Sequence, residues 1–335
     1  MPLQQSRAKL GETTSMTRQV EDKKAELASR IHLGVLPAMA TPLNADGETI
    51  NESGVESLVN FLIELGVKGL FIGGTTGEGI LLDLEARMRL HERAFDVIDG
   101  RVPALIHIGA NTSSRSIQLA GHAQDIGADS IVAVTPYFYP IHDDALLQFY
   151  QSLAEAAPEI PLFAYDIPHL AQNSISPKLL PRLVESIPSF AGLKTSRADA
   201  QLIRSLVDAV SGRAIVLAGN ERIALGSLAL GADGLISGLS TAVPEPFVSM
   251  VASFAAGDYD GARTDQKRIN RILDLMPGGA RIGAIKAILT ERGIPAGPAI
   301  PPRPMPDDNW LGWSLIKREI TSKQWLMLNS NQIRT

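Results

Sequence analysis

The stretch Pro188-Ser-Phe-Ala-Gly-Leu-Lys194-Thr-Ser196 decides how the rest of the chain is interpreted. Its middle is an apolar run bounded by a proline and by polar residues, and such a run predicts a buried β-strand. Lys194 closes the run, so its amine is expected where access to solvent begins to fall. Because desolvation favours the neutral amine, and a neutral amine can attack a ketone, Lys194 is a candidate for forming a Schiff base. A lysine in this place can equally be an ordinary solvated strand end, so the rest of the sequence must decide.

Apolar segments and helical patterns alternate on both sides of this stretch. Eight segments are expected to be strands, at residues 34–43, 69–74, 102–109, 129–135, 161–165, a sixth ending at Lys194, 214–218 and 234–237. Helices are expected at residues 51–66, 84–98, 113–126, 143–157, 176–186, 199–210 and 222–230. Three similar segments begin at Gly66, Gly127 and Gly231. In each, the glycine ends a predicted helix and a predicted strand follows, as expected for repeated units.

This alternation predicts an α/β fold with a parallel sheet covered by helices. Eight strand–helix units within residues 32–240 match a (β/α)8 TIM barrel, and residues 241–335 are expected to add C-terminal helices and a tail packed on the barrel. Those helices are expected at 245–256, 258–275 and 283–292, followed by a proline-rich segment at 294–306. The tail holds Trp310, Trp313 and Trp325, which predict a docking surface on the barrel or on a neighbouring subunit. An open doubly wound sheet is the alternative, but no G-x-G-x-x-G follows the first strand.

Composition and the N-terminal segment exclude several classes of function. Residues 1–31 form a polar extension, interpreted as a tag or disordered arm with at most a short helix from Thr17 to Ser29. It lacks the apolar core of a signal peptide, and no run of about 18 apolar residues predicts a membrane span, so a cytoplasmic protein is expected. A net charge of −5 gives no reason to expect nucleic acid as a partner, and the absence of cysteine excludes a Cys nucleophile. The six histidines show no metal-ligand spacing, so neither a metal nor another cofactor is expected.

In a barrel, the side chains at the carboxyl ends of the strands meet in one site. The predicted strand ends carry hydroxyls, phenols, one amine and one glycine. The residues are Thr75, Thr76, Tyr137, Tyr165, Lys194, Gly219 and Ser237. Among these groups only the Lys194 amine can form an imine. The pattern therefore favours Schiff-base chemistry at the carboxyl end of the predicted barrel.

Three motifs, Gly74-Thr-Thr-Gly-Glu78, Tyr165-Asp-Ile-Pro168 and Gly192-Leu-Lys-Thr195, resemble signatures of the dihydrodipicolinate synthase/N-acetylneuraminate lyase family. Ala40-Thr-Pro42 with Asp46-Gly47, and the segment Gly231–Ser237, resemble that family too, in order along residues 33–301. The resemblance implies a TIM barrel with extra C-terminal helices, usually a tetramer. It also implies Schiff-base chemistry on pyruvate or another 2-oxo acid, without a cofactor.

The resemblance assigns roles to individual residues. Lys194 would form the imine, Tyr165 would shuttle protons beside it, and Thr75 would link that tyrosine to other donors. Thr76 and its backbone N–H would hold the 2-oxo carboxylate. The other residues assigned to substrate binding are Gly74, Gly77, Tyr137, Gly219, Ile236, Ser237 and His169. The expected partners are pyruvate, an aldehyde and further copies of the chain, as a tetramer or dimer.

Three departures from the family pattern bear on the substrate. Leu170 stands where the synthase branch has an arginine for the distal carboxylate, and Phe138 stands where that branch has its second relay tyrosine. Arg222 replaces one of two acids that the sialic acid branch has after the seventh strand. The expected function is therefore an aldolase for a 2-keto-3-deoxy sugar acid or a 4-hydroxy-2-oxo acid. 4-Hydroxy-tetrahydrodipicolinate synthase, N-acetylneuraminate lyase and a non-catalytic barrel that binds a small acid remain alternatives.

Overall fold

Eight parallel strands form a single sheet in a computed structural model that describes residues 18–320. The strands are β1 Gly34–Pro37, β2 Leu70–Ile72, β3 Ala104–His107, β4 Ser130–Val134, β5 Leu162–Asp166, β6 Phe190–Thr195, β7 Ile215–Ala218 and β8 Gly234–Ser237. Their order is β1-β8-β7-β6-β5-β4-β3-β2. The ring is completed between the two end strands by a parallel bridge of Ala38 with Phe71. The predicted (β/α)8 barrel is thereby confirmed.

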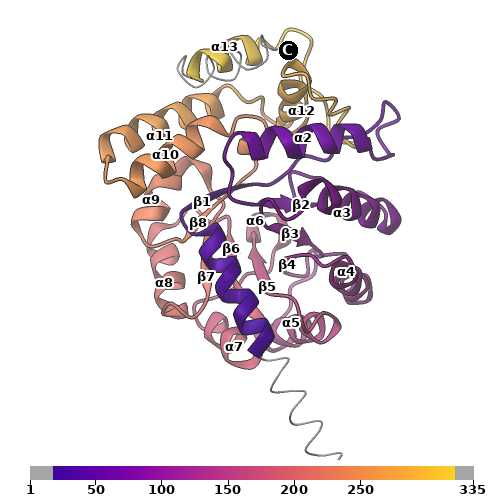
Figure 1. Cartoon of the computed structure of the whole chain (residues 1–335), viewed down its shortest axis with the longest axis vertical. Coiled ribbons are helices and arrows are strands. Elements are labelled where there is room, and N and C mark those ends of the chain that lie inside the picture. The colour runs from indigo at the N-terminus through magenta and orange to yellow at the C-terminus, as the bar shows by residue number, and fades with distance from the viewer. Residues whose placement is uncertain (1–17, 321–335) are drawn as a thin grey trace, which may run out of the picture.

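Helices surround this barrel (Figure 1). Those that connect the strands are α2 Glu52–Glu64, α3 Leu84–Ile98, α4 Ser113–Asp125, α5 Asp143–Ala156, α6 Pro168–Ala171, α7 Leu179–Ser186, α8 Ala200–Val210, the 3-10 turn Glu221–Ile223 and α9 Ala224–Ala229. Several begin where the sequence offers a cap, since the side chains of Asn51, Asp83, Thr112 and Asp199 each accept the backbone N–H three residues on. The short α6 was not expected, and it begins at a proline, a residue suited to the first turn of a helix.

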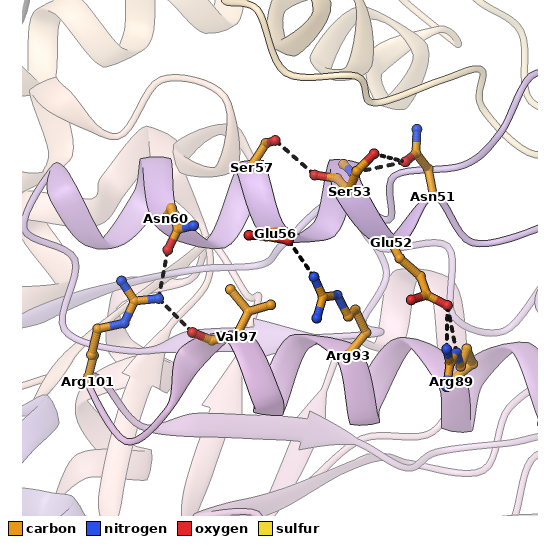
Figure 2. A network of polar contacts seen from close by, with 11 residues as sticks. Asn51, Glu52, Ser53, Glu56, Ser57, Asn60, Arg89, Arg93, Val97 and Arg101 are labelled. Carbon is orange, nitrogen blue, oxygen red and sulfur yellow. Dashed lines mark hydrogen bonds and ion pairs between the residues drawn. The ribbon is translucent and has the colours of Figure 1, made fainter. Parts of the chain in front are cut away.

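Polar pairs join the outer faces of α2 and α3 (Figure 2). The partners are spaced four residues apart on α2, so they share one face of that helix. They are Glu52 with Arg89 and Glu56 with Arg93 of α3, and Asn60 with Arg101, which follows α3. Because these groups are largely exposed, the pairs are expected to contribute little to stability.

The N-terminal extension is not wholly a disordered arm, because residues 18–31 form a helix. Val20, Leu27 and Ile31 are buried, and the spacing of these three residues places them on one side of the helix. Lys23 donates to the carbonyl of Glu159, and Lys24 donates to that of Pro188, both just before strands. The helix therefore packs across the N-terminal end of the barrel, opposite the predicted site (Figure 1).

The C-terminal region adds helices to one side of the barrel (Figure 1). They are the 3-10 turn Leu239–Thr241, α10 Glu245–Ala255, α11 Tyr259–Asp274, α12 Arg281–Glu291 and α13 Gly312–Glu319. Two of the tryptophans contact the C-terminal helices of this chain, and their docking on the barrel or on a neighbouring subunit stays a prediction. Trp310 donates its indole N–H to the Leu275 carbonyl, and the ring of Trp313 faces the Arg292 guanidinium. Trp325 lies outside the described residues. No helix in the described part of the chain has the length and apolarity needed to cross a membrane.

A buried ion pair joins the barrel to this region. Lys286 of α12 lies 2.9 Å from the carboxylate of Glu78, which follows β2, and both side chains are fully buried. Burial lowers the pKa of Lys286, and the charge of Glu78 opposes that effect. Glu78 also accepts the N–H of Ile300, while Lys286 donates to the Pro298 carbonyl. One ion pair thus fixes the loop that carries Thr75 and Thr76 against the proline-rich segment.

Lys286→Met is expected to destabilise the protein by about 3–5 kcal/mol, because it leaves the Glu78 carboxylate buried without its countercharge. Urea unfolding followed by circular dichroism measures this change. Arg89→Gln, which breaks an exposed pair, is the control and should leave the urea midpoint nearly unchanged. Equal midpoints for the two variants would contradict the role given to the buried pair.

Candidate active site

The alignment of β5 with β6 brings Tyr165 and Lys194 together. The two residues are direct partners in the parallel register, and both point into the barrel. The register shifts by one residue between Leu162 and Phe163, which is a β-bulge in β6. Gly192 permits this bulge, because a Cβ there would collide with the ring of Phe163. Without the shift, Tyr165 would pair with Leu193, whose side chain belongs to the outer core.

The Lys194 amine lies over an aromatic surface. Its Nζ is 3.9 Å from the centre of the Tyr165 ring and 4.6 Å from that of Phe71. The Tyr165 hydroxyl lies 3.2 Å from Thr75 Oγ1. Lys194 is only 4% exposed and forms no ion pair with a carboxylate of the described residues. The amine is thus held in a buried place by its strand and by two rings rather than by a countercharge.

The neighbouring carboxylate is turned away, as the alternation of a strand requires. Asp166 is fully buried and its Oδ2 accepts from Arg197 Nε at 2.7 Å. It also accepts from the Thr195 hydroxyl and from the Ile175 N–H. All of these partners lie outside the barrel interior, so Asp166 stabilises the ends of β5 and β6 and is not available to the Lys194 amine.

His107 of β3 supports the Tyr165 ring from another side. Their rings lie edge to face with centres 6.1 Å apart. Burial, together with the charges of Arg87 and Lys194, holds the pKa of His107 well below its ordinary value, so the imidazole is neutral. Its Nδ1 lies 3.1 Å from the Gly73 carbonyl and its Nε2 accepts from the Val134 N–H, which together hold the ring in place. No local sequence pattern indicates this role, since His107 falls inside an ordinary apolar strand.

A cavity of about 620 Å³ opens above the amine. Seven of the residues predicted for the site line it, namely Thr75, Thr76, Tyr165, His169, Lys194, Gly219 and Ile236. Gly219 gives room for the amine, because a Cβ there would lie 3.2 Å from Lys194 Cε and 2.7 Å from Ser196 Oγ. The carboxyl ends of β2, β5, β6, β7 and β8 therefore meet at this cavity, as the barrel predicts.

Four predicted residues do not line the cavity. Gly74 packs against the Phe71 ring, and the Gly77 carbonyl accepts from the Thr41 hydroxyl at 2.5 Å. Ser237 is buried, and its hydroxyl donates to the Glu221 carboxylate. Tyr137 lies in a separate small pocket with Arg87 and Arg115, where burial raises the pKa of its phenol against the effect of both charges. The loops after β2 and β4 turn the two glycines and Tyr137 away from Lys194, and Ser237, at the end of β8, is turned toward Glu221.

The C-terminal region supplies much of the outer wall, which the strand ends alone could not indicate. Residues 276–279, Arg281 and Ile282 line it, as does Arg303 of the proline-rich segment. Glu221 is nearly buried, and its carboxylate accepts from the Ser237 hydroxyl, the Leu239 N–H and Arg281 Nη2. Arg222 pairs with Asp274 at 2.8 Å. The cavity wall is therefore built from the barrel and from the C-terminal helices together.

The sequence matches the model of the dihydrodipicolinate synthetase family over residues 32–309. It is 31% identical to a 4-hydroxy-tetrahydrodipicolinate synthase of Methanocaldococcus jannaschii over 79% of this chain and 90% of that protein. It is also 31% identical to a probable 2-dehydro-3-deoxy-D-pentonate aldolase of Escherichia coli, over 70% of this chain and 79% of that one. The matched region contains the whole barrel and the C-terminal segment that forms the cavity wall.

Solved structures share the fold closely. The sialic acid aldolase of Ruminococcus gnavus superimposes with a TM-score of 0.83 at 28% identity, covering 87% of this chain and 97% of that one. A prophage protein of Escherichia coli from the dihydrodipicolinic acid synthase family, solved in complex with pyruvate, gives 0.80 at 28% identity, covering 85% and 98%. With a family model that covers most of its length and relatives matched along nearly all of theirs, the chain belongs to the dihydrodipicolinate synthetase family of class I, lysine Schiff-base lyases.

Proposed function

We propose that the protein is an aldolase that cleaves a 2-keto-3-deoxy sugar acid or a 4-hydroxy-2-oxo acid into pyruvate and an aldehyde, or joins them. The observation that carries the proposal is the buried Lys194 amine, 3.9 Å from the Tyr165 ring centre, with the phenol next to Thr75. An amine, a phenol and a hydroxyl at the floor of a cavity are the groups that imine formation and proton transfer need.

In this proposal, the neutral amine of Lys194 attacks the substrate C2 carbonyl, and the carbinolamine loses water to give the imine. The proton of the 4-hydroxyl then passes to a basic group while the C3–C4 bond breaks. The bonding electrons move onto C3 and into the imine, leaving an enamine and releasing the aldehyde. Protonation of C3 and addition of water then release pyruvate and restore the amine. Tyr165 is the group that we assign to these proton transfers, with Thr75 orienting its hydroxyl.

The substrate carboxylate is assigned to the loop after β2. Thr76 is nearly buried and lines the cavity, so its hydroxyl and N–H can hold the anion without competition from bulk water. Gly238 lies directly behind it, where a Cβ would meet Thr76 Oγ1. This placement puts the 2-oxo group of a bound acid between Thr76 and the amine. Gly74 and Gly77 would act by shaping this loop rather than by touching the substrate.

The cavity favours a substrate longer than pyruvate and argues against the synthase reaction. Its volume of about 620 Å³ lies within the range of sites for small metabolites. Leu170, where the synthase branch carries a cationic side chain, is 60% exposed and offers no hydrogen bond to a carboxylate. The similarity to the Methanocaldococcus synthase makes the synthase reaction the second candidate function. The similarity to the probable pentonate aldolase supports the proposed aldolase function.

We also propose that the chain works as a homo-oligomer in the cytoplasm. Phe138 and Tyr139 stack edge to face on the surface and are 76% and 71% exposed, and Ile80 and Leu81 are exposed as well. Apolar groups of this size on a surface commonly mark a contact with another protein. These exposed groups support an oligomer, a tetramer or a dimer, and the cytoplasmic location stays a prediction of the sequence.

Pyruvate with borohydride is expected to add the mass of a reduced pyruvate adduct to one peptide, the one that contains Lys194. The reason is that the imine forms only at an amine that faces the cavity, and Lys194 is the lysine that lines it. Peptide mass spectrometry measures the labelling. The adduct should be absent in Lys194→Ala, and labelling that persists in that variant would show that another amine reacts.

Tyr165→Phe is expected to lower the rate of carbon–carbon cleavage by about two to four decades, because it removes a positioned acid–base group but keeps the ring under the amine. The measurement is pyruvate release from the best substrate in a panel of 2-keto-3-deoxy sugar acids and 4-hydroxy-2-oxo acids. The urea midpoint of the variant should stay close to that of the parent protein, since the ring remains packed. Cleavage at nearly the parent rate would show that another residue transfers the proton. His169, which lines the cavity, would then be the next residue to replace.

A further inference from the structure

The wall of the active-site cavity carries more positive than negative charge. Beside Lys194 it includes the guanidinium groups of Arg222, Arg281 and Arg303, against the single carboxylate of Glu221. Two of the three arginines are committed, since Arg281 binds Glu221 and Arg222 binds Asp274. Within residues 18–320 the guanidinium of Arg303 has neither an ion pair nor a hydrogen bond with a side chain or carbonyl. Among the arginines that line the cavity in the described part of the chain, Arg303 is therefore the one left free to bind a ligand.

Arg303 is held on a turn that is fixed on both sides. Its own N–H donates to the Ile300 carbonyl, and the N–H of Ile300 donates to the buried carboxylate of Glu78. On the other side, the Pro304 carbonyl packs so closely against Gly283 of α12 that no side chain would fit there. The turn is therefore set by the same carboxylate that follows Thr75 and Thr76. The backbone that carries the Arg303 side chain therefore has a defined position at the cavity wall.

We propose that Arg303 is a specificity-determining residue that binds an anionic group at the far end of the substrate, a terminal carboxylate or phosphate. This inference rests on the proposed aldolase function and narrows its substrate class. Thr76 takes the 2-oxo carboxylate at the buried floor, next to Lys194, and Arg303 takes the second anion from the partly exposed rim. Carboxylate and phosphate share the geometry that a guanidinium binds with two parallel hydrogen bonds.

The test uses three 4-hydroxy-2-oxo acids of matched length that end in a carboxylate, a phosphate or a neutral hydroxymethyl group. Pyruvate release is measured for the full chain and for Arg303→Gln, Arg303→Lys and Arg204→Gln. The last variant is the matched control, because Arg204 lies on the exposed face of α8 and pairs with Asp208. Trapping of pyruvate on Lys194 with borohydride is measured in each variant as a separate readout.

The unmodified protein is expected to prefer one of the two anionic ends to the neutral end by about 10- to 100-fold in kcat/KM. Arg303→Gln should remove that preference through KM, with kcat and pyruvate trapping unchanged, and Arg303→Lys should keep part of it. The preferred anion identifies the terminal group. Arg204→Gln should behave as the parent protein does.

Two results would overturn the assignment of Arg303. One is a parent protein that handles the neutral end as well as either anion, and the other is an Arg303→Gln variant that loses the same factor on all three compounds. If borohydride traps no pyruvate on the parent protein, that result would instead contradict the aldolase function. In that case equilibrium binding of the same three compounds still decides whether Arg303 selects an anionic end.

Discussion

The position of Lys194 opposite Tyr165 depends on a single shift in strand register. In parallel strands each residue has a fixed neighbour, and a slip of one residue turns every following side chain to the other face of the sheet. The bulge next to Gly192 makes that slip once, so Leu193 packs outward and Lys194 points inward. The floor of the cavity, the amine over the Tyr165 ring and the hydroxyl contact to Thr75 all follow from it.

The second constraint couples the barrel to its C-terminal region. A buried carboxylate at Glu78 needs a countercharge, and α12 supplies it through Lys286. The same carboxylate receives the Ile300 N–H, so the loop that holds Thr76 and the turn that holds Arg303 share one anchor. A barrel without its C-terminal helices would thus lack both the outer wall of the cavity and the group that fixes its inner loop. This is a physical reason why the fold of this chain extends beyond eight strand–helix units.

Local patterns in the sequence were sufficient for the fold because apolar strands and capped helices are local signals. Asn51, Asp83 and Asp199 begin helices where their side chains predict it. The interpretation of residues 18–31 was wrong in part, because Val20, Leu27 and Ile31 are a sparse apolar stripe within a charged segment. Only the open N-terminal end of the barrel gives that stripe a partner, and no local pattern reports such an opening.

The site was predictable to the extent that its residues lie at strand ends. Lys194, Tyr165 and Thr75 meet as expected because the barrel gathers those ends. Tyr137 does not join them, since the loop after β4 carries it to Arg87 and Arg115, and loop paths are not encoded in strand periodicity. Arg281 and Arg303 were missed for a related reason, because they come from segments far along the chain that only tertiary packing brings to the barrel.

The central claim is that one amine, placed by the bulge, receives the substrate while the loop after β2 holds its carboxylate. A crystal structure of the protein soaked with pyruvate tests it most directly. We expect continuous electron density from Lys194 Nζ to C2 of pyruvate, with the carboxylate on Thr76 and the Tyr165 hydroxyl beside the imine. Pyruvate bound without a covalent bond, or with its carboxylate on another part of the cavity, would contradict this account.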